Sequence, residues 1–367
     1  MDKPIIPQMT QPITELPRVH DPSIPPLPKH IFPSNDDDSF LSSSTPFTFA
    51  STYLRFKSAK MGDLPDTFDK PVHIAVIGGT GLGQLEGFEP VAALNPITPW
   101  GPPASPIQIL SHKGGYVAFL ARHGVHHQFA PHEVPNRANI AALRHIGVRS
   151  VIAFSAVGSL QEEIKPMDFV VPDQVIDRTK GIRPFTFFEG GVVGHVGFAD
   201  PFDAGLAKVV KACAAHMEGE GVVLHEKGTV VVMEGPQFST RAESHMYRSW
   251  GGSVINMSTL PEAKLAREAE LAYQVIAMAT DYDCWHSFED VNVELVIRYM
   301  KSNNENAKRL VAGVLDRLAE LDNSDLVLAK HWEGASQGAV KFMTKPAGRD
   351  PEAKKRVEYL FPGFWEE

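Results

Sequence analysis

The stretch Val72-His73-Ile74-Ala75-Val76-Ile77-Gly78-Gly79-Thr80-Gly81-Leu82-Gly83 is an apolar run followed at once by glycines. A short apolar run rich in branched residues predicts a buried strand, and a glycine turn after it is typical of α/β domains. The glycine spacing is not that of a dinucleotide-binding fingerprint, since Gln84 stands where the last glycine is needed, and no Gly-Lys-Ser/Thr follows. Two interpretations remain for this loop, an oxyanion site and a structural turn.

Similar apolar runs recur along the chain and alternate with segments of helical periodicity. Further strands are expected at residues 116–120, 150–157, 168–171, 229–233, 253–257 and 273–280, and helices at 136–146, 200–217, 241–250, 261–271 and 292–321. Alternation of strands with helices predicts an α/β domain with a mostly parallel core sheet.

Composition limits the possible partners and compartments. The chain has 367 residues, 43% of them hydrophobic, and a formal net charge of −9. That charge argues against nucleic acid or an anionic membrane as the main partner, and no apolar run approaches the ~18 residues of a membrane span. Cys213 and Cys284 form no CxxC pair, which indicates a reducing compartment and excludes a disulfide framework.

The two ends of the chain differ from its middle. Residues 1–68 are expected to be a disordered extension, because prolines crowd its first half and Asp36-Asp37-Asp38 and Ser42-Ser43-Ser44 follow. Such a composition cannot bury enough apolar surface to offset chain entropy. Residues 69–322 are predicted to form the folded domain. Residues 323–367 form a C-terminal extension that we expect to pack on the domain or at an interface.

Two carboxylates follow the last predicted strand. Asp281 and Asp283 come directly after the run Tyr273-Gln274-Val275-Ile276-Ala277-Met278-Ala279-Thr280. Ligands of open α/β sheets bind beyond the carboxyl ends of the strands. Two acids there are a cation site, a pair of hydrogen-bond acceptors for a ligand, or a solvated loop.

Hydroxyl groups and a cation follow other predicted strands. Thr80, Arg122, Ser155 and Ser258 all stand at expected strand ends, where together they would form a phosphate-binding cup. Several histidines follow Arg122 closely, but no motif such as HExxH accompanies them, so no metal site is expected. These histidines are His123, His126, His127 and His132.

Eight motifs occur together in an order known from one protein family. They are Ile77-Gly78-Gly79-Thr80-Gly81-Leu82, Ala121-Arg122-His123-Gly124, Val134-Pro135-Asn136-Arg137-Ala138-Asn139-Ile140, Gly158-Ser159-Leu160, Glu234-Gly235-Pro236-Gln237-Phe238-Ser239, Arg241-Ala242-Glu243-Ser244, Ile255-Asn256-Met257-Ser258 and Ala279-Thr280-Asp281-Tyr282-Asp283-Cys284-Trp285. Over residues 72–320 the chain closely resembles the 5′-methylthioadenosine phosphorylases, which belong to the trimeric purine nucleoside phosphorylases. The resemblance implies a single α/β domain with a central mixed, largely parallel sheet flanked by helices.

The resemblance also implies a reaction. Phosphate attacks the anomeric carbon of 5′-methylthioadenosine and releases adenine and 5-methylthioribose 1-phosphate, in methionine and purine salvage. Inorganic phosphate is a co-substrate, and no cofactor is expected. The implied assembly is a homotrimer, and the expected compartment is the cytoplasm, with the nucleus as a further candidate.

The resemblance assigns roles to individual residues. Phosphate contacts are implied for Thr80, Arg122, His123, Ser155, Ala156 and Ser258. Contacts to the base and sugar are implied for Phe238, Ile255, Asn256, Met257, Asp281, Asp283, His127 and Val296, and for His195 from a neighbouring subunit. Ser239 and Val293 correspond to positions linked with substrate preference. Ser155 and Ser258 replace threonines that are common in the family, and both keep the hydroxyl group.

The physical requirements of glycosidic cleavage fit the acid pair. Negative charge flows into the purine as it leaves, so a group must protonate or hydrogen-bond N7, and two close carboxylates in a desolvated cleft push one pKa upward. The resemblance suggests Asp281 for this role and Asp283 as the acceptor for the 6-amino group. The alternatives are a broader purine nucleoside phosphorylase, a catalytically silent nucleoside-binding protein and a phosphate-independent hydrolase.

Overall fold

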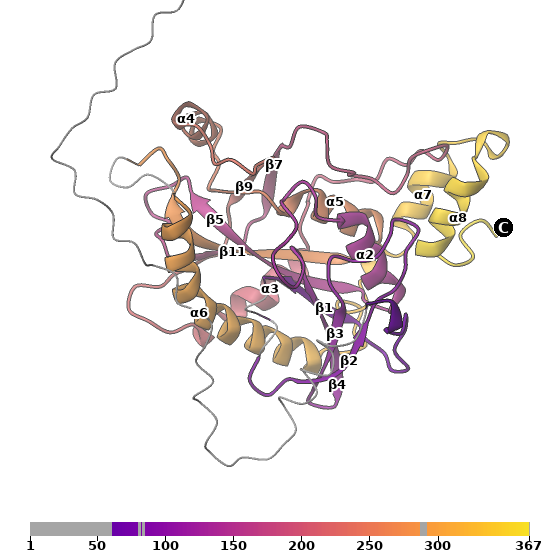
Figure 1. The fold of residues 1–367 in the computed structure, drawn as a ribbon, viewed down its shortest axis with the longest axis horizontal. Coiled ribbons are helices and arrows are strands. Elements are labelled where there is room, and N and C mark those ends of the chain that lie inside the picture. The colour runs from indigo at the N-terminus through magenta and orange to yellow at the C-terminus, as the bar shows by residue number, and fades with distance from the viewer. Residues whose placement is uncertain (1–60, 80–81, 83–84, 287–291, 367) are drawn as a thin grey trace, which may run out of the picture. The chain divides into compact units, whose positions relative to one another are not determined.

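The computed structural model describes residues 61–79, 82, 85–286 and 292–366 (Figure 1). Most of the predicted N-terminal extension, and Thr80, lie outside the described residues. In the described part, no helix is both long and apolar enough to cross a membrane.

The core is one mixed sheet in the order β2-β3-β4-β1-β5-β10-β9-β7, with β11 on β5, β6 on β11 and β8 on β6. Its strands are β1 (Ile74–Gly78), β2 (Glu89–Leu94), β3 (Ile107–His112), β4 (Gly115–Ala121), β5 (Ser150–Ser159), β6 (Phe169–Val170), β7 (Gln174–Arg178), β8 (Leu224–His225), β9 (Thr229–Met233), β10 (Val254–Asn256) and β11 (Ala272–Tyr282). The central strands β4, β1, β5 and β11 are parallel, and the β2-β3-β4 edge is antiparallel. The predicted α/β class with a mixed, largely parallel sheet is therefore confirmed.

Strand β5 changes partner halfway along its length. Residues 150–153 pair with β1, and residues 158 and 159 pair with β10 on the same side. Within the described residues, 154–157 have no strand partner on that side, although β11 follows β5 along its other side. The sheet therefore forks at residues 154–157, at the carboxyl end of β1.

Helices cover both faces of the sheet (Figure 1). They are α2 (Asn136–His145), α3 (Ala204–Ala212), α4 (Arg241–Ser249), α5 (Thr259–Glu268), α6 (Val293–Glu320), α7 (Ala335–Lys341) and α8 (Pro351–Leu360). Alternate residues of a strand point to opposite faces, so Ala75 and Ile77 join a core with α2 and α5, whereas Ile74 and Val76 join one with α3 and α6.

Three details of the sequence prediction were wrong. Ser155 lies in the middle of β5 rather than at its end, because the strand continues to Ser159. The helix expected at 200–217 is shorter, since Asp203 caps α3 by accepting a hydrogen bond from the Leu206 N–H. Strands β2, β3, β7 and β8 were not predicted, and β2 and β7 expose many of their side chains at the sheet edges.

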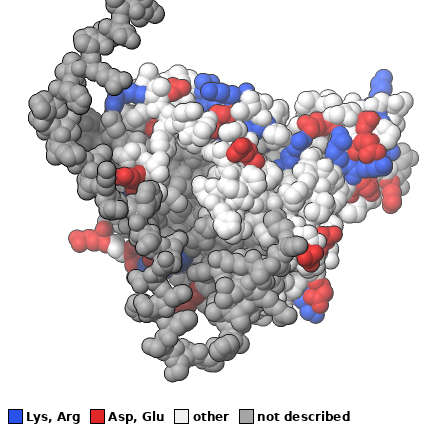
Figure 2. Space-filling view, in the orientation of Figure 1, with Lys and Arg blue, Asp and Glu red and all other residues white. Residues whose placement is uncertain are grey.

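The C-terminal residues lie against the domain. Leu360 and Phe364 are buried in the same core as α2, and the Arg144 guanidinium lies 5.0 Å from the centre of the Phe361 ring. Acidic and basic side chains are interspersed over α7 and α8 instead of forming patches of one sign (Figure 2).

We expect Leu360→Ala to lower the free energy of unfolding by about 2–5 kcal/mol, because the side chain is 2% exposed and its removal leaves a cavity. Phe342→Ala is the matched control: this side chain is 89% exposed, so its loss should change stability by less than about 0.5 kcal/mol. Urea unfolding followed by tryptophan fluorescence measures both. Equal effects of the two substitutions would contradict the burial of α8.

Candidate active site

A cavity of about 590 Å³ lies against the fork of β5, at the carboxyl ends of β1 and β4. Among its lining residues are many that the sequence predicted: Arg122, His123, His127, Ser155, Ala156, Phe238, Ile255, Asn256, Met257, Ser258, Asp281, Asp283 and Val296. Residues from β5, β10, β11 and α6, and from the segment after β4, thus meet in one place, although up to 174 positions separate them in the chain.

Arg122 is held at one side of the cavity by a buried acid. Its Nε and Nη2 atoms donate to Glu262 at 2.7 and 2.8 Å, and Nη1 donates to the Phe154 carbonyl at 2.8 Å. Burial lowers the pKa of Arg122, but the Glu262 carboxylate outweighs it and the net shift is upward. These bonds use three of the five guanidinium N–H groups, and the buried Tyr273 hydroxyl is a further partner of Arg122.

The predicted hydroxyl groups form a short hydrogen-bonded chain. Ser155 Oγ and Ser258 Oγ are 2.8 Å apart, and the Asn256 amide donates to Ser155 Oγ at 2.9 Å and to Thr259 Oγ1 at 2.7 Å. Ser155 also approaches the Ala156 carbonyl at 3.1 Å. Asn256 therefore orients the two serines next to the unpaired stretch of β5.

His123 is an uncharged member of the site. Burial and the charge of Arg122 lower the pKa of His123 to about 4. Its Nδ1 lies 2.8 Å from the Phe129 carbonyl, which can only accept, so Nδ1 carries the proton and Nε2 is an acceptor. His127 stacks on this ring at a centroid distance of 4.7 Å.

A bulge in β11 turns Asp281 into the cavity. The register with β5 shifts between Ala279 and Asp281, so that Thr280 and Asp281 both line the cavity although they are consecutive. Burial raises the pKa of Asp281 to about 7, a 2.8 Å hydrogen bond from the Thr280 hydroxyl opposes the rise, and the charge of Asp283 adds to it. Burial is thus the larger cause and the neighbouring carboxylate the smaller one, and the sequence-based argument named both.

Asp283 follows β11 and has an unused acceptor. Its Oδ2 atom is buried and has no hydrogen-bond partner among the described residues. Burial raises the pKa of Asp283, and the Ser239 and Ser244 hydroxyls partly offset that rise. A buried carboxylate oxygen without a partner is costly, so a ligand N–H would stabilise it.

Three predicted residues do not line the cavity within this chain. Ser239 lies behind Asp283, where its carbonyl accepts from Cys284 Sγ at 3.1 Å. Val293 is 62% exposed at the start of α6. His195 is exposed on a loop beside α7, and its N–H donates to the Ala339 carbonyl at 3.4 Å.

Sequence reasoning missed Glu262 and Gly158. Glu262 is the partner of Arg122, and its only signal was a lone acid within an otherwise apolar helix turn. A Cβ atom on Gly158 would lie 2.9 Å from Asp281 Oδ1, so the missing side chain makes room for the acid. Gly158 belongs to one of the eight motifs quoted above, but no local pattern predicted that it lies against Asp281.

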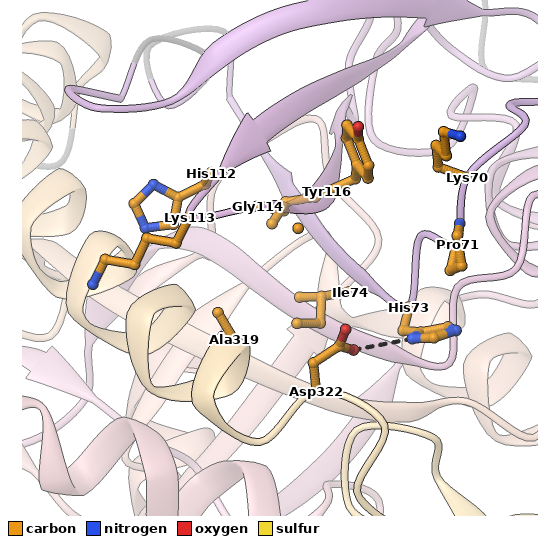
Figure 3. Close-up of a pocket in the computed structure, with 12 residues that line it drawn as sticks. Lys70, Pro71, His73, Ile74, His112, Lys113, Gly114, Tyr116, Ala319 and Asp322 are labelled. Atoms are coloured by element: carbon orange, nitrogen blue, oxygen red, sulfur yellow. Dashed lines mark hydrogen bonds and ion pairs between the residues drawn. The ribbon is translucent and has the colours of Figure 1, made fainter.

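A second cavity, of about 450 Å³, lies at the opposite ends of β1 and β4 (Figure 3). His73 Nδ1 bonds Asp322 at 3.0 Å there, and Lys113 pairs with Asp316 at 2.8 Å. None of the sequence-predicted site residues lines it. In the described part of the chain, no group of three or more His, Cys, Asp or Glu side chains is placed to hold a metal ion.

Comparison with known proteins fits this geometry. Residues 73–316 match the phosphorylase superfamily. The S-methyl-5′-thioadenosine phosphorylase of Fusarium vanettenii is 92% identical over 307 residues, which cover 84% of this chain and all of that relative. The chain belongs to the S-methyl-5′-thioadenosine phosphorylase family.

Solved structures of this family share the fold. A methylthioadenosine phosphorylase from an antarctic soil metagenomic library has a TM-score of 0.73 and 41% identity, and the match covers 80% of this chain and 99% of that one. A variant of the adenosine/methylthioadenosine phosphorylase from Schistosoma mansoni, solved with methylthioadenosine, has a TM-score of 0.68 and 30% identity, with 74% and 99% covered.

Asp281→Asn should stabilise the protein in a pH-dependent way. The acid keeps its proton to about pH 7 when folded but loses it near pH ~4 when unfolded, so the wild-type chain loses stability between these values. Relative to wild type, the free energy of unfolding of the variant should rise by up to about 4 kcal/mol across that range. Above it the difference should stay constant.

The matched control is Asp177→Asn, for which the pH dependence of stability has the opposite sign. Lys264 and Thr179 outweigh burial and lower the pKa of Asp177, so its contribution to stability is present above the unfolded pKa and is lost as pH falls. Asp177→Asn should therefore become less stable than wild type as pH rises through the acid range. Urea unfolding at each pH measures both variants, and a pH-independent difference for Asp281→Asn would contradict the raised pKa.

Proposed function

We propose that the protein cleaves the N-glycosidic bond of 5′-methylthioadenosine with phosphate, giving adenine and 5-methylthioribose 1-phosphate. The observation that carries the proposal is the presence of two unlike polar groups in one cavity. Arg122, Ser155 and Ser258 gather at the fork of β5, whereas Asp281 pairs with Gly158, further along the same strand. At about 3.3 Å per residue the two groups lie roughly 10 Å apart, which leaves room for a nucleoside.

The hydroxyl and arginine end holds the phosphate. Arg122 offers its positive charge and its guanidinium to the phosphate oxygens. The hydroxyls of Ser155 and Ser258 donate to these oxygens once they turn away from the Ala156 carbonyl and from each other, and the open backbone at Ala156 adds a further contact. His123, neutral at pH 7, accepts at Nε2 from a protonated oxygen. The family resemblance adds Thr80 to this set. Phosphate is itself the nucleophile, so the site supplies position and charge complementarity rather than a covalent intermediate.

The acid end binds the base. Asp281, with a pKa of about 7, can keep a proton at neutral pH and give it to N7 as the glycosidic bond breaks. The partnerless Oδ2 of Asp283 accepts from the 6-amino group. A 6-oxopurine would place its carbonyl oxygen, which can only accept, against the Asp283 carboxylate. Adenine nucleosides are therefore favoured over inosine.

The remaining cavity residues surround the base and sugar. Phe238, Ile255 and Met257 pack on them, Asn256 orients the hydroxyl chain, and His127 and Val296 lie toward the 5′ substituent. Ser239, next to Asp283, and Val293, exposed at the start of α6, influence substrate preference, as the resemblance implies. No cofactor is needed for this chemistry.

Assembly and location extend the proposal. Large apolar side chains are exposed near the cavity: Phe238 on the loop after β9, and Val293 and Ile297 at the start of α6. Such exposure is expected where a neighbouring subunit covers the site. We assign a homotrimer, with His195 approaching a neighbour's cavity, as the resemblance implies. The free cysteines support a reducing compartment, the cytoplasm with the nucleus as a further candidate.

Adenine release should depend on phosphate. With 5′-methylthioadenosine and phosphate, we expect turnover that falls to background in phosphate-free buffer, while inosine is cleaved far more slowly. Chromatography of the released base measures both. Undiminished adenine release without phosphate would indicate a hydrolase, equal rates with inosine a broader phosphorylase, and binding without release a silent binding protein.

Asp281→Asn should lower turnover by about 10²–10⁴-fold, because a positioned general acid contributes that much. Wild-type turnover should fall as pH rises through about 7, where Asp281 loses its proton, and the variant should lack this part of the profile. Asp177→Asn, which is outside the cavity, is the control. Near-normal turnover of the Asp281 variant would refute the acid role.

A further inference from the structure

Arg183 lies outside the predicted site and has all its donors engaged. The side chain is 3% exposed, on the segment that follows β7. Its Nε donates to Glu234 Oε1, Nη1 donates to the carbonyls of Met257 at 2.6 Å and Leu260 at 2.7 Å, and Nη2 donates to those of Glu234 and Met233, the latter at 3.3 Å. A guanidinium has five N–H groups, and each one has its own acceptor here.

The five acceptors come from two separate walls of the cavity. Met233 and Glu234 end β9 and lead into the loop that carries Phe238, whereas Met257 and Leu260 follow β10 on either side of Ser258. Met233 and Met257 themselves line the cavity. A narrow crevice beside it is bordered by Arg183 together with Arg122, His123 and Ser258.

We propose that Arg183 is a positioning residue that fixes the phosphate-side loop, residues 257–260, to the base-side loop, residues 233–238. This proposal rests on the proposed phosphorolysis and adds to it a residue that touches neither substrate. Its fixed fork donates to four carbonyls, two from each loop, whereas a lysine has only three N–H donors. Glu234 balances the charge and also accepts from the Lys180 N–H at 2.6 Å.

The hydrogen bonds from Arg183 to the two loops, called the Arg183 clamp below, matter because the two substrates react only in a narrow range of relative positions. A displacement of about 1 Å between reacting groups can cost on the order of 10²-fold in rate. The carbonyls held by Arg183 are one residue from Ser258 on one side and a few residues from Phe238 on the other. A shift of either loop would therefore change phosphate and nucleoside placement together.

Arg183→Lys tests the clamp, and Arg267→Lys is its matched control. Arg267 is 6% exposed and also donates to two carbonyls, those of Gly197 at 3.1 Å and Asp200 at 2.5 Å, but it lines no part of the active-site cavity. We expect Arg183→Lys to lower kcat/KM about 10²-fold and to raise KM for both substrates, whereas Arg267→Lys stays within about twofold at a temperature where both are folded. Equal kinetics of the two variants at equal loss of stability would overturn the proposal.

A second measurement needs no variant and no turnover. Hydrogen–deuterium exchange of the free wild-type protein should show residues 233–238 and 257–260 already protected, with little further change when phosphate and adenine are added. Rapid exchange that slows only with these ligands would overturn the clamp. Loss of adenine release from wild type would instead contradict the proposed function. The exchange result would still decide whether the two loops are fixed before ligands bind, and Arg183→Lys, which should exchange faster in both loops than Arg267→Lys, ties that order to Arg183.

Discussion

The backbone of β5 at residues 154–157 is the constraint on which the site depends. These residues sit inside a sheet yet have no strand beside them toward β1 and β10 within the described part of the chain. Buried backbone groups need partners, so the gap is stable only where side chains or a ligand supply them. Arg122 donates to the Phe154 carbonyl, and the Ser155 hydroxyl donates to the Ala156 carbonyl. The fork therefore creates a cavity. It also leaves backbone groups there that need polar partners.

Buried charge at this cavity is compensated locally. Arg122 is paired with Glu262, and Arg183 is paired with Glu234, so neither guanidinium is an isolated charge. Each arginine acts mainly as a rigid set of directed donors, one toward the open side of the cavity and one toward the loops that form it. In the proposed reaction, donors that are fixed before the ligand arrives let an acidic protein, with a net charge of −9, bind an anion.

The central strands and much of the site could be predicted because each depends on local sequence. Continuous apolar runs predicted β1, β4, β5, β9 and β11, and Arg122, Asp281 and Asp283, at or just beyond the ends of β4 and β11, line one cavity. Pairing partners are not local, so neither the fork of β5 nor the mid-strand place of Ser155 could be predicted. Glu262 was missed for the same reason. It pairs with Arg122 only because the fold places α5 against that side chain, which is more than a hundred residues away in the chain.

The proton on Asp281 follows from the fold more than from its acidic neighbour. Burial is the main cause of its raised pKa, and Asp283 adds less than the Thr280 hydrogen bond removes. The bulge that turns the acid inward and the bare Gly158 beneath it are therefore as necessary as the carboxyl group itself. Val296 and Met300 of α6 line the same cavity, so α6 supplies part of its apolar wall. A fold that admitted water here would lower the pKa of Asp281 and leave a carboxylate that can accept a proton but not donate one.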